Sequence, residues 1–215
     1  MARFTLVRPL VNYNVEVWSG DDGTHIQTLE GHVGYVCAIA VGVDGRVYSG
    51  SSDTTIRVWL GEDGANQQTL VGHDGCVNAL AVSLAGSLYS GSEDCRIRVW
   101  SGDDGAHIQT LEGGYNARYP VTALTIDAEN KLYSGHKDGV IRVWSCADNW
   151  LLHTLPWRPD GFESQSVKSL LVGCDGSLFS SYEARRPDNP GDVRRLSRGC
   201  PVLPTRIVGS RFLIW

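Results

Sequence analysis

The side chains of this chain that could carry chemistry are histidine, serine and aspartate residues that recur in two matching sets. The sets are 41 residues apart: His32, Ser49 and Asp53, then His73, Ser90 and Asp94. A base, a nucleophile and an orienting acid are the parts of a hydrolase triad. A reaction needs only one such site, however, and the sequence lacks the G-x-S-x-G nucleophile elbow. We therefore predict that the sets are structural and that the chain is not an enzyme.

Two further patterns raise the question of a metal site. Asp21-Asp22-Gly23 and Asp103-Asp104-Gly105 place paired carboxylates before a glycine, and His25 and His107 follow them at matching positions. A calcium-binding EF-hand loop needs carboxylates at alternating positions and a glutamate at position twelve. Aspartate and glycine are also ordinary turn residues. The sequence predicts neither a metal nor a cofactor.

The cysteines are too sparse for a disulfide scaffold and none forms a C-x-x-C pair. They occupy different positions of the repeat described below: Cys37, Cys76, Cys95, Cys146, Cys174 and Cys200. We expect them to be reduced and to fill space.

Composition indicates a soluble globular chain. The 215 residues include 19 Lys or Arg and 24 Asp or Glu, for a net charge of −5, and 42% are apolar. The longest uncharged apolar stretch, residues 33–43, has eleven residues, fewer than the roughly 18 that a membrane helix needs. The amino terminus lacks a secretory apolar core. We expect no membrane contact and a cytoplasmic or nuclear location.

Charge is distributed unevenly. Residues 1–184 hold 22 acidic and 12 basic side chains, whereas residues 185–215 hold two acidic side chains and seven arginines. A basic segment could touch nucleic acid, but this one lacks interleaved aromatic residues and contains four prolines. We interpret it as a degenerate carboxyl-terminal segment and do not expect nucleic acid as a partner.

A repeat of about 41 residues organises the rest of the chain. Trp18, Trp59, Trp100 and Trp144 are separated by 41, 41 and 44 residues, and I-R-V-W ends three of the four units. Upstream of three tryptophans stand V-Y-S-G-S, L-Y-S-G-S and L-Y-S-G-H. Periods of this length are typical of propellers and other stacked arrays.

Each unit is predicted to contain four short strands, a to d. In the first full unit, the predicted strands a to d are Val36–Val41, Arg46–Ser49, Thr55–Trp59 and Asn66–Leu70. Tight hairpins are marked by residues that tolerate positive φ, such as Asp44-Gly45 and Glu129-Asn130. No window keeps a helical apolar period, so helix should be nearly absent. Such units must stack as blades around an axis.

These motifs resemble the WD40 repeat family. The resemblance rests on Gly31-His32 and Gly72-His73 before strand a, Ser-Gly-Ser ending strand b, an aspartate at 53, 94 and 138, and the closing tryptophan. It covers roughly residues 10–182. It implies an all-β, incomplete WD40-like β-propeller of about three full blades and two partial ones, over residues 1–182, followed by the separate segment 183–215.

The chain departs from the family pattern in three places. Ser19, Leu60, Ser101 and Ser145 follow the tryptophans where the family has Asp. Gly114 stands at the position of His32 and His73, so the third full blade should lack its histidine. The last unit loses the pattern after Tyr182.

The resemblance also assigns roles. It implies a buried chain of hydrogen bonds in each blade, from Asp to His, from His to Ser and from Ser to the indole. The residues of this structural network are His32, Ser49, Asp53, Trp59, His73, Ser90, Asp94, Trp100, Ser134, Asp138 and Trp144.

In the family, protein or peptide partners usually dock on the face that carries the d–a loops and b–c turns. On this chain that face includes Tyr35, Cys37, Ser52, Cys76, Asn78, Glu93, Thr122 and Lys137. We predict a non-catalytic scaffold for protein–protein interaction. Two alternatives stay open: a substrate-recognition adaptor of a ubiquitin ligase, although Trp-Asp-x-Arg is absent, and a fragment of a larger propeller without a function of its own. Open blade edges, including apolar residues 212–215, would favour self-association.

Overall fold

The chain is built from strands, as the sequence predicts. The computed structural model describes residues 13–60, 64–111, 118–155 and 166–182, and within these ranges it contains sixteen strands and no helix. The strands are β1 (Val15–Trp18), β2 (His25–Leu29), β3 (Val36–Val41), β4 (Val47–Ser51), β5 (Ile56–Trp59), β6 (Asn66–Leu70), β7 (Val77–Val82), β8 (Leu88–Ser92), β9 (Ile97–Trp100), β10 (His107–Leu111), β11 (Val121–Ile126), β12 (Lys131–His136), β13 (Ile141–Ser145), β14 (Leu151–Leu155), β15 (Val167–Val172) and β16 (Leu178–Tyr182).

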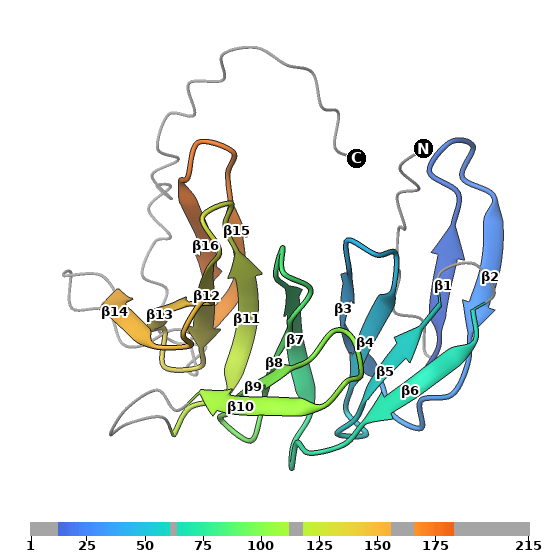
Figure 1. Cartoon of the computed structure of the whole chain (residues 1–215), viewed down its shortest axis with the longest axis horizontal. Helices are drawn as coiled ribbons and strands as arrows, with labels where there is room; N and C mark the ends of the chain where they lie inside the picture. Colours follow the sequence, from blue (N-terminus) through green and yellow to red (C-terminus); the bar gives the residue numbers. More distant parts are fainter. Residues whose placement is uncertain (1–12, 61–63, 112–117, 156–165, 183–215) are drawn as a thin grey trace, which may run out of the picture. The chain divides into compact units, whose positions relative to one another are not determined.

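Three complete antiparallel sheets and two half-sheets form the described part of the chain (Figure 1). The complete sheets are β3-β4-β5-β6, β7-β8-β9-β10 and β11-β12-β13-β14, and the half-sheets are β1-β2 and β15-β16. The prediction of three full units and two partial ones is confirmed. All described residues lie in the unit Met1–Ala184. The predicted separate segment 183–215, with its apolar end at 212–215, lies outside the described residues.

The hairpins turn where the sequence predicts. Gly45 adopts φ of 83° between β3 and β4, and Asn130 adopts φ of 62° between β11 and β12. Glycine and asparagine are the residues that enter this left-handed region at least cost. The predicted hairpin in the first full blade is therefore present, although its second strand extends to Ser51 rather than ending at Ser49.

Neighbouring blades contact one another through their first strands. β7 packs beside both β3 and β11, and β11 packs beside β15. Buried side chains fill the spaces between sheets, so that Ile56 and Leu70 of one blade share a cluster with Val77 and Trp100 of the next. The outermost strands are exposed; every residue of β14 is accessible to solvent. Burial, and with it hydrophobic stabilisation, thus concentrates between blades.

A glycine and a valine form a repeated contact between successive blades. A Cβ atom placed on Gly50 would lie 2.6 Å from Cγ1 of Val77, and one on Gly135 would lie 2.5 Å from Cγ1 of Val167. Gly91 faces Val121 in the same way. The valines are completely buried. The Ser-Gly dipeptide of strand b therefore contains a glycine because the next blade's first strand lies against that backbone.

We expect Gly91→Ala to destabilise the protein by roughly 1 to 3 kcal/mol, since the new methyl group overpacks against Val121. Chemical denaturation measures the change. The double variant Gly91→Ala, Val121→Ala is the control: removing the opposing methyl groups should make the pair of substitutions less costly than the sum of the two single ones. Strictly additive costs would show that the two residues are not in contact.

Candidate functional site

A chain of hydrogen bonds joins four side chains in each of the first two complete blades. His32 Nδ1 lies 2.8 Å from the Asp53 carboxylate, and its Nε2 lies 2.8 Å from Ser49 Oγ. The indole Nε1 of Trp59 donates to the same Oγ at 2.8 Å. In the next blade the corresponding distances are 2.7, 2.7 and 2.8 Å, joining Asp94, His73, Ser90 and Trp100. The structure thus brings together the eight network residues that the sequence analysis placed in these two blades.

The aspartates of these networks are held in their charged form. Burial opposes ionisation of Asp53, but hydrogen bonds from Thr55, His32 and the Val33 amide outweigh it and lower the pKa of the carboxyl to about 2. Burial likewise opposes ionisation of Asp94, and hydrogen bonds from His73 and two backbone amides lower its pKa to about 2. Each carboxylate is therefore ionised at neutral pH and bonded on both oxygens.

The serines of the networks are not placed for nucleophilic attack. Ser49 and Ser90 are completely buried. Each Oγ lies between an imidazole and an indole that donates to it. A nucleophile must reach its substrate and be free to form a bond with it. These sets therefore connect strands rather than present a reactive group.

The third complete blade has a histidine after all, supplied from a different position. His136, at the end of β12, places its Nε2 2.9 Å from Ser134 Oγ, to which Trp144 Nε1 donates at 2.9 Å. The Asp138 carboxylate accepts from the Val140 amide rather than from this histidine, and it lies 3.6 Å from the Arg142 guanidinium. Gly114 lies outside the described residues. The prediction that Asp138 is without a histidine partner agrees with these contacts, but the expectation that the network of this blade has no histidine is wrong, because the motif Leu-Tyr-Ser-Gly-His supplies one where the other blades have serine.

His136 should make stability pH-dependent. Burial, reinforced by the charge of Arg142, lowers the pKa of His136 from 6.5 to about 4. Because the unfolded chain binds a proton in this interval and the folded one does not, we expect the free energy of unfolding to decrease as pH falls from about 6.5 to about 4. Urea titrations across this range measure the decrease. His136→Gln, which keeps a hydrogen-bonding side chain but does not titrate, should flatten it. An unchanged slope in that variant would contradict the assignment.

A polar groove opens where the first strands of successive blades begin. Its volume is about 420 Å³. Five of the eight partner-binding residues proposed from the sequence line it: Cys37, Asn78, Glu93, Thr122 and Lys137. Three further lining residues were missed by the sequence analysis: Pro120, Ser166 and Lys168. Tyr35, Ser52 and Cys76 are not among its lining residues. We call this hollow the inner-strand groove.

β-bulges aim side chains into the inner-strand groove. The pairing of the first two strands of each blade shifts register at the second residue of the first strand, which is Cys37, Asn78, Thr122 or Lys168. A bulge leaves one residue outside the ladder and redirects its side chain. All four bulge residues line the groove. Lys168 was missed because its unit retains little of the repeat pattern, although its place after Val167 matches that of Asn78 after Val77.

Hydrogen bonds between blades and within a blade hold the groove wall. The Asn78 amide donates to the Val121 carbonyl of the next blade at 3.3 Å, and Thr122 Oγ1 donates to the Gly135 carbonyl of its own blade at 3.1 Å. Glu93 and Lys137 follow the second strands of neighbouring blades and carry opposite charges. The groove therefore presents hydrogen-bonding groups and charges of both signs.

The comparison with known families identifies the repeat. The family model described as WD domain, G-beta repeat matches residues 23–59, 64–101 and 105–145, more than half of the chain. The chain belongs to the WD40 repeat family. Its incomplete WD40-like β-propeller fold, proposed above as a resemblance, is confirmed. No curated protein matches the sequence.

Solved structures support the same WD40 assignment. One described as the structure of U3-55K is 26% identical, with a TM-score of 0.58, over 66% of this chain and 44% of that chain. Another, described as the crystal structure of RRP9 WD40 repeats, is 26% identical, with a TM-score of 0.59, over 66% of this chain and 43% of that one. The present WD40 chain thus spans less than half the length of either.

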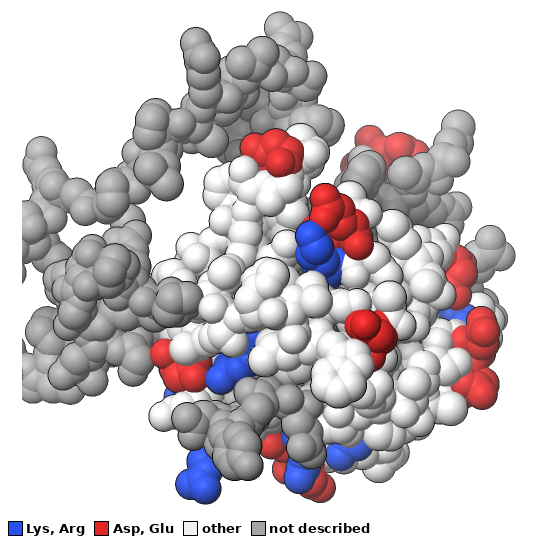
Figure 2. Space-filling model, turned by 60° about the vertical axis from the view of Figure 1, so that its left-hand side comes forward, with Lys and Arg blue, Asp and Glu red and all other residues white. Residues whose placement is uncertain are grey.

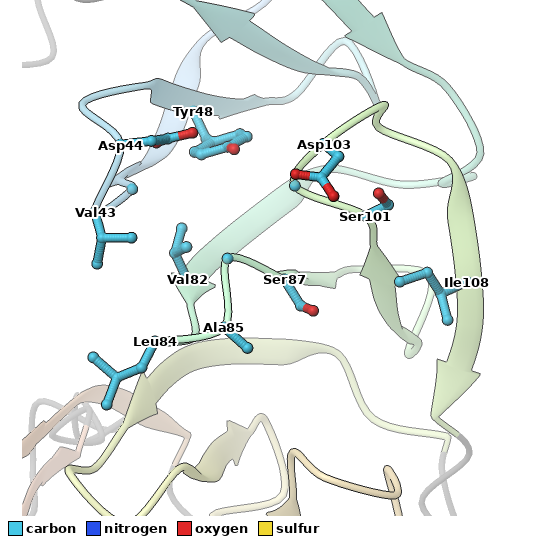
Figure 3. Close-up of a pocket in the computed structure, with 13 residues that line it drawn as sticks. Val43, Asp44, Tyr48, Val82, Leu84, Ala85, Ser87, Ser101, Asp103 and Ile108 are labelled. Carbon is cyan, nitrogen blue, oxygen red and sulfur yellow. The ribbon is translucent and has the colours of Figure 1, made fainter.

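A second hollow lies on the WD40 blades away from the inner-strand groove. It has a volume of about 430 Å³, and Figure 3 shows its lining drawn from the β3–β4, β7–β8 and β9–β10 hairpins. Val43 and Leu84 on its rim are 74% and 68% exposed, and Asp44 and Asp103 add negative charge. None of the partner-binding residues proposed from the sequence lines this hollow.

Metal-ligating side chains, long apolar helices and surface charge were compared in the described part of the WD40 chain. Its histidine, cysteine and acidic side chains nowhere gather in a group of three that could hold a metal ion. None of its elements is a helix long and apolar enough to cross a membrane. On the face seen in Figure 2, acidic and basic side chains are scattered among uncharged ones and form no broad patch of a single sign.

Proposed function

We propose that this chain is a non-catalytic WD40 scaffold that binds a protein or peptide partner in the inner-strand groove. The observation that carries the proposal is the convergence of four bulge residues, one from each of four successive blades, on that single groove. A bulge weakens the strand ladder in order to redirect a side chain, and bulges are enriched beside functional sites. The repeated blades thus place bulge residues of different types at equivalent positions along the groove.

The chemistry of the groove favours a polar peptide segment. Asn78 and Thr122 offer hydrogen bonds, Glu93 offers a negative charge, and Lys137 and Lys168 offer positive charges. The lining changes residue type from blade to blade, which suits recognition of a partner surface rather than of a repeating ligand. A polar groove of this kind gives specificity by complementarity more than by buried apolar area.

The scaffold function is proposed ahead of the ubiquitin-ligase adaptor. The adaptor form of the family carries Asp after the tryptophan that ends strand c, and the chain has Leu60, Ser101 and Ser145 at these positions in its complete blades. A catalytic function lacks a candidate centre in the described ranges, because the serines of the Asp-His-Ser sets are buried. A cytoplasmic or nuclear location stays a prediction.

Partner capture with matched variants tests the proposal. The intact chain serves as bait, bound proteins are identified by mass spectrometry, and the affinity of the purified partner is then measured by calorimetry. Lys137→Glu changes a charge in the groove, and Lys131→Glu changes the same charge at the opposite end of β12. We expect Lys137→Glu to weaken binding at least tenfold and Lys131→Glu to leave it nearly unchanged. Equal effects, or loss only in Lys131→Glu, would refute docking in this groove.

We also propose self-association through the half-sheet β15-β16. All five residues of β4 and β8 are buried, whereas the middle of β16 is accessible and Phe179 is 50% exposed. Within the described ranges β16 has no strand on its outer side. Such an edge pairs readily with another chain. Sedimentation of the intact chain should show a concentration-dependent oligomer; a monomer at all concentrations, with β16 amides protected from hydrogen exchange, would refute it.

A further inference from the structure

Two thiols from neighbouring blades meet at the wall of the inner-strand groove. Cys76 Sγ lies 3.2 Å from Cys37 Sγ, although the residues are 39 positions apart in the sequence. Both are free cysteines, Cys37 exposed and Cys76 partly buried. Within the described ranges no other pair of thiols is in contact: Cys95 donates to the Glu93 carbonyl, and Cys146 and Cys174 contact no sulfur.

The fold itself produces this contact. Cys37 is the bulge residue of β3, and Cys76 immediately precedes β7, the strand that packs beside β3. In the following pair of blades the same geometry directs Asn78, the bulge residue of β7, to the Val121 carbonyl at the start of β11. A bulge side chain thus reaches across to the beginning of the next blade, and in the first pair it meets Cys76, one residue before Val77, the counterpart of Val121.

The backbone around both thiols is fixed by hydrogen bonds. The Cys76 carbonyl accepts from the Glu93 amide at 2.9 Å, and the Tyr35 carbonyl accepts from the Ser52 amide at 2.8 Å and from the Cys37 thiol at 3.4 Å. A disulfide has an S–S length of about 2.05 Å, so the two sulfur atoms must approach by roughly 1 Å. Rotation about the Cα–Cβ bonds of two cysteines moves their sulfur atoms by distances of this order.

We propose that Cys37 and Cys76 form a reversible disulfide that joins the first two complete blades, with an oxidised low-molecular-weight thiol, a glutathione-type disulfide, as the oxidant. The Cys37 thiolate attacks one sulfur of the oxidant, forming a mixed disulfide and releasing one thiolate. Cys76 then loses its proton to solvent and attacks Cys37 Sγ, releasing the second thiolate. Two protein thiols are oxidised and one external disulfide is reduced to two thiols.

The order of the two steps follows from exposure. Cys37 is open to solvent, so it meets the oxidant first. Burial, with further contributions from Cys37 and from the negative charges of Glu93 and Asp53, raises the pKa of the Cys76 thiol to about 12. Because the thiolate is the attacking species, the second step limits the rate at neutral pH. In the mixed disulfide, burial and the negative charges of Glu93 and Asp53 still oppose ionisation of Cys76, so that step should accelerate as pH rises.

Closure of the disulfide would also change the groove, since Cys37 lines it. This consequence rests on the proposed function, whereas formation of the bond does not. Oxidation would remove a thiol from the groove wall and fix the spacing of two blades. A partner that binds the reduced groove should then bind the oxidised chain differently, which links partner capture to the thiol redox state.

Disulfide mapping of the intact chain tests the proposal without any partner. The protein is equilibrated in buffers of reduced and oxidised glutathione, remaining thiols are alkylated, and peptides are analysed by mass spectrometry. We expect a Cys37–Cys76 peptide pair in buffers that leave Cys95, Cys146 and Cys174 alkylated, and dithiothreitol should reverse it. Persistent glutathione on Cys37 with Cys76 alkylated, or oxidation of the other cysteines first, would overturn the proposal.

Serine variants separate the steps. Cys76→Ser should trap the intermediate, so that Cys37 retains glutathione, and Cys37→Ser should abolish the linked pair. Cys146→Ser, which removes a partly buried thiol elsewhere, is the matched control and should form the Cys37–Cys76 bond at the wild-type buffer ratio. If Cys76→Ser accumulates no more glutathione on Cys37 than the wild type does, Cys76 is not the resolving thiol.

Discussion

Trp100→Ala should destabilise the protein by roughly 3 to 5 kcal/mol, as large-to-small substitutions of buried aromatic residues do. Trp100 is 2% exposed and packs in the cluster between the first two complete blades. Its removal leaves a cavity and also deprives Ser90 of the indole that donates to its hydroxyl. Equilibrium unfolding in urea or guanidinium, followed by circular dichroism, measures the loss.

Two controls distinguish the causes of this loss. Glu93→Ala removes an exposed side chain from the turn after β8 and should change stability by less than about 0.5 kcal/mol. Trp100→Phe retains much of the apolar volume but not the indole nitrogen, so it should fall between the two. Similar losses for Trp100→Ala and Glu93→Ala would contradict the register of the blade.

The positions of the strands could be read from the sequence because local and long-range signals agree. Apolar residues alternate or cluster over four to six positions, and turn residues such as Asp44-Gly45 interrupt them at each hairpin. A repeat adds a further constraint, since one interpretation must fit every unit. The strand Asn66–Leu70 was therefore located to the residue, although four of its five residues are exposed and it has little apolar character of its own.

The inner-strand groove was only partly predictable, for two physical reasons. Pro120, Ser166 and Lys168 precede or begin strands in units whose motifs are altered, so the family pattern does not mark them. In addition, a bulge reverses the side to which one side chain points, and simple alternation along β15 does not reveal this at Lys168. The contact between Cys37 and Cys76 depends on the same bulge and on the placement of neighbouring blades.

In the third complete blade the hydrogen bonds among histidine, serine and tryptophan are kept, whereas the bond between aspartate and histidine is lost. Ser134 and Trp144 stay as in the other blades, but the histidine comes from within β12 rather than from the preceding loop. His136 Nδ1 lies 3.4 Å from the Tyr119 carbonyl, where His32 and His73 have a carboxylate. Asp138 is thereby released from the histidine, which makes the blades experimentally distinguishable.

Asp53→Asn should therefore cost much more stability than Asp138→Asn. Asp53 Oδ1 accepts from the Thr55 amide and hydroxyl, and Oδ2 accepts from the Val33 amide and His32. The side-chain amide of asparagine has one oxygen, which accepts, and one NH₂ group, which donates. In either orientation of the amide, the NH₂ group would therefore face groups that also donate. Losing a charge-assisted bond and leaving buried donors unsatisfied should cost roughly 3 to 4 kcal/mol.

Asp138→Asn should cost roughly 1 to 2 kcal/mol. Its Oδ1 accepts from the Val140 amide at 3.0 Å, a bond that the amide oxygen of asparagine can keep, so the loss comes from the ion pair between Oδ2 and the Arg142 guanidinium at 3.6 Å. Urea titrations at pH 7 measure both variants. The Asp53 contribution should be complete above pH 4 and should disappear as pH falls through its folded pKa of about 2, so wild type and Asp53→Asn should converge in acid. Equal losses of stability for the two variants at pH 7 would contradict the conclusion that Asp53, unlike Asp138, is part of a hydrogen-bond network with a histidine.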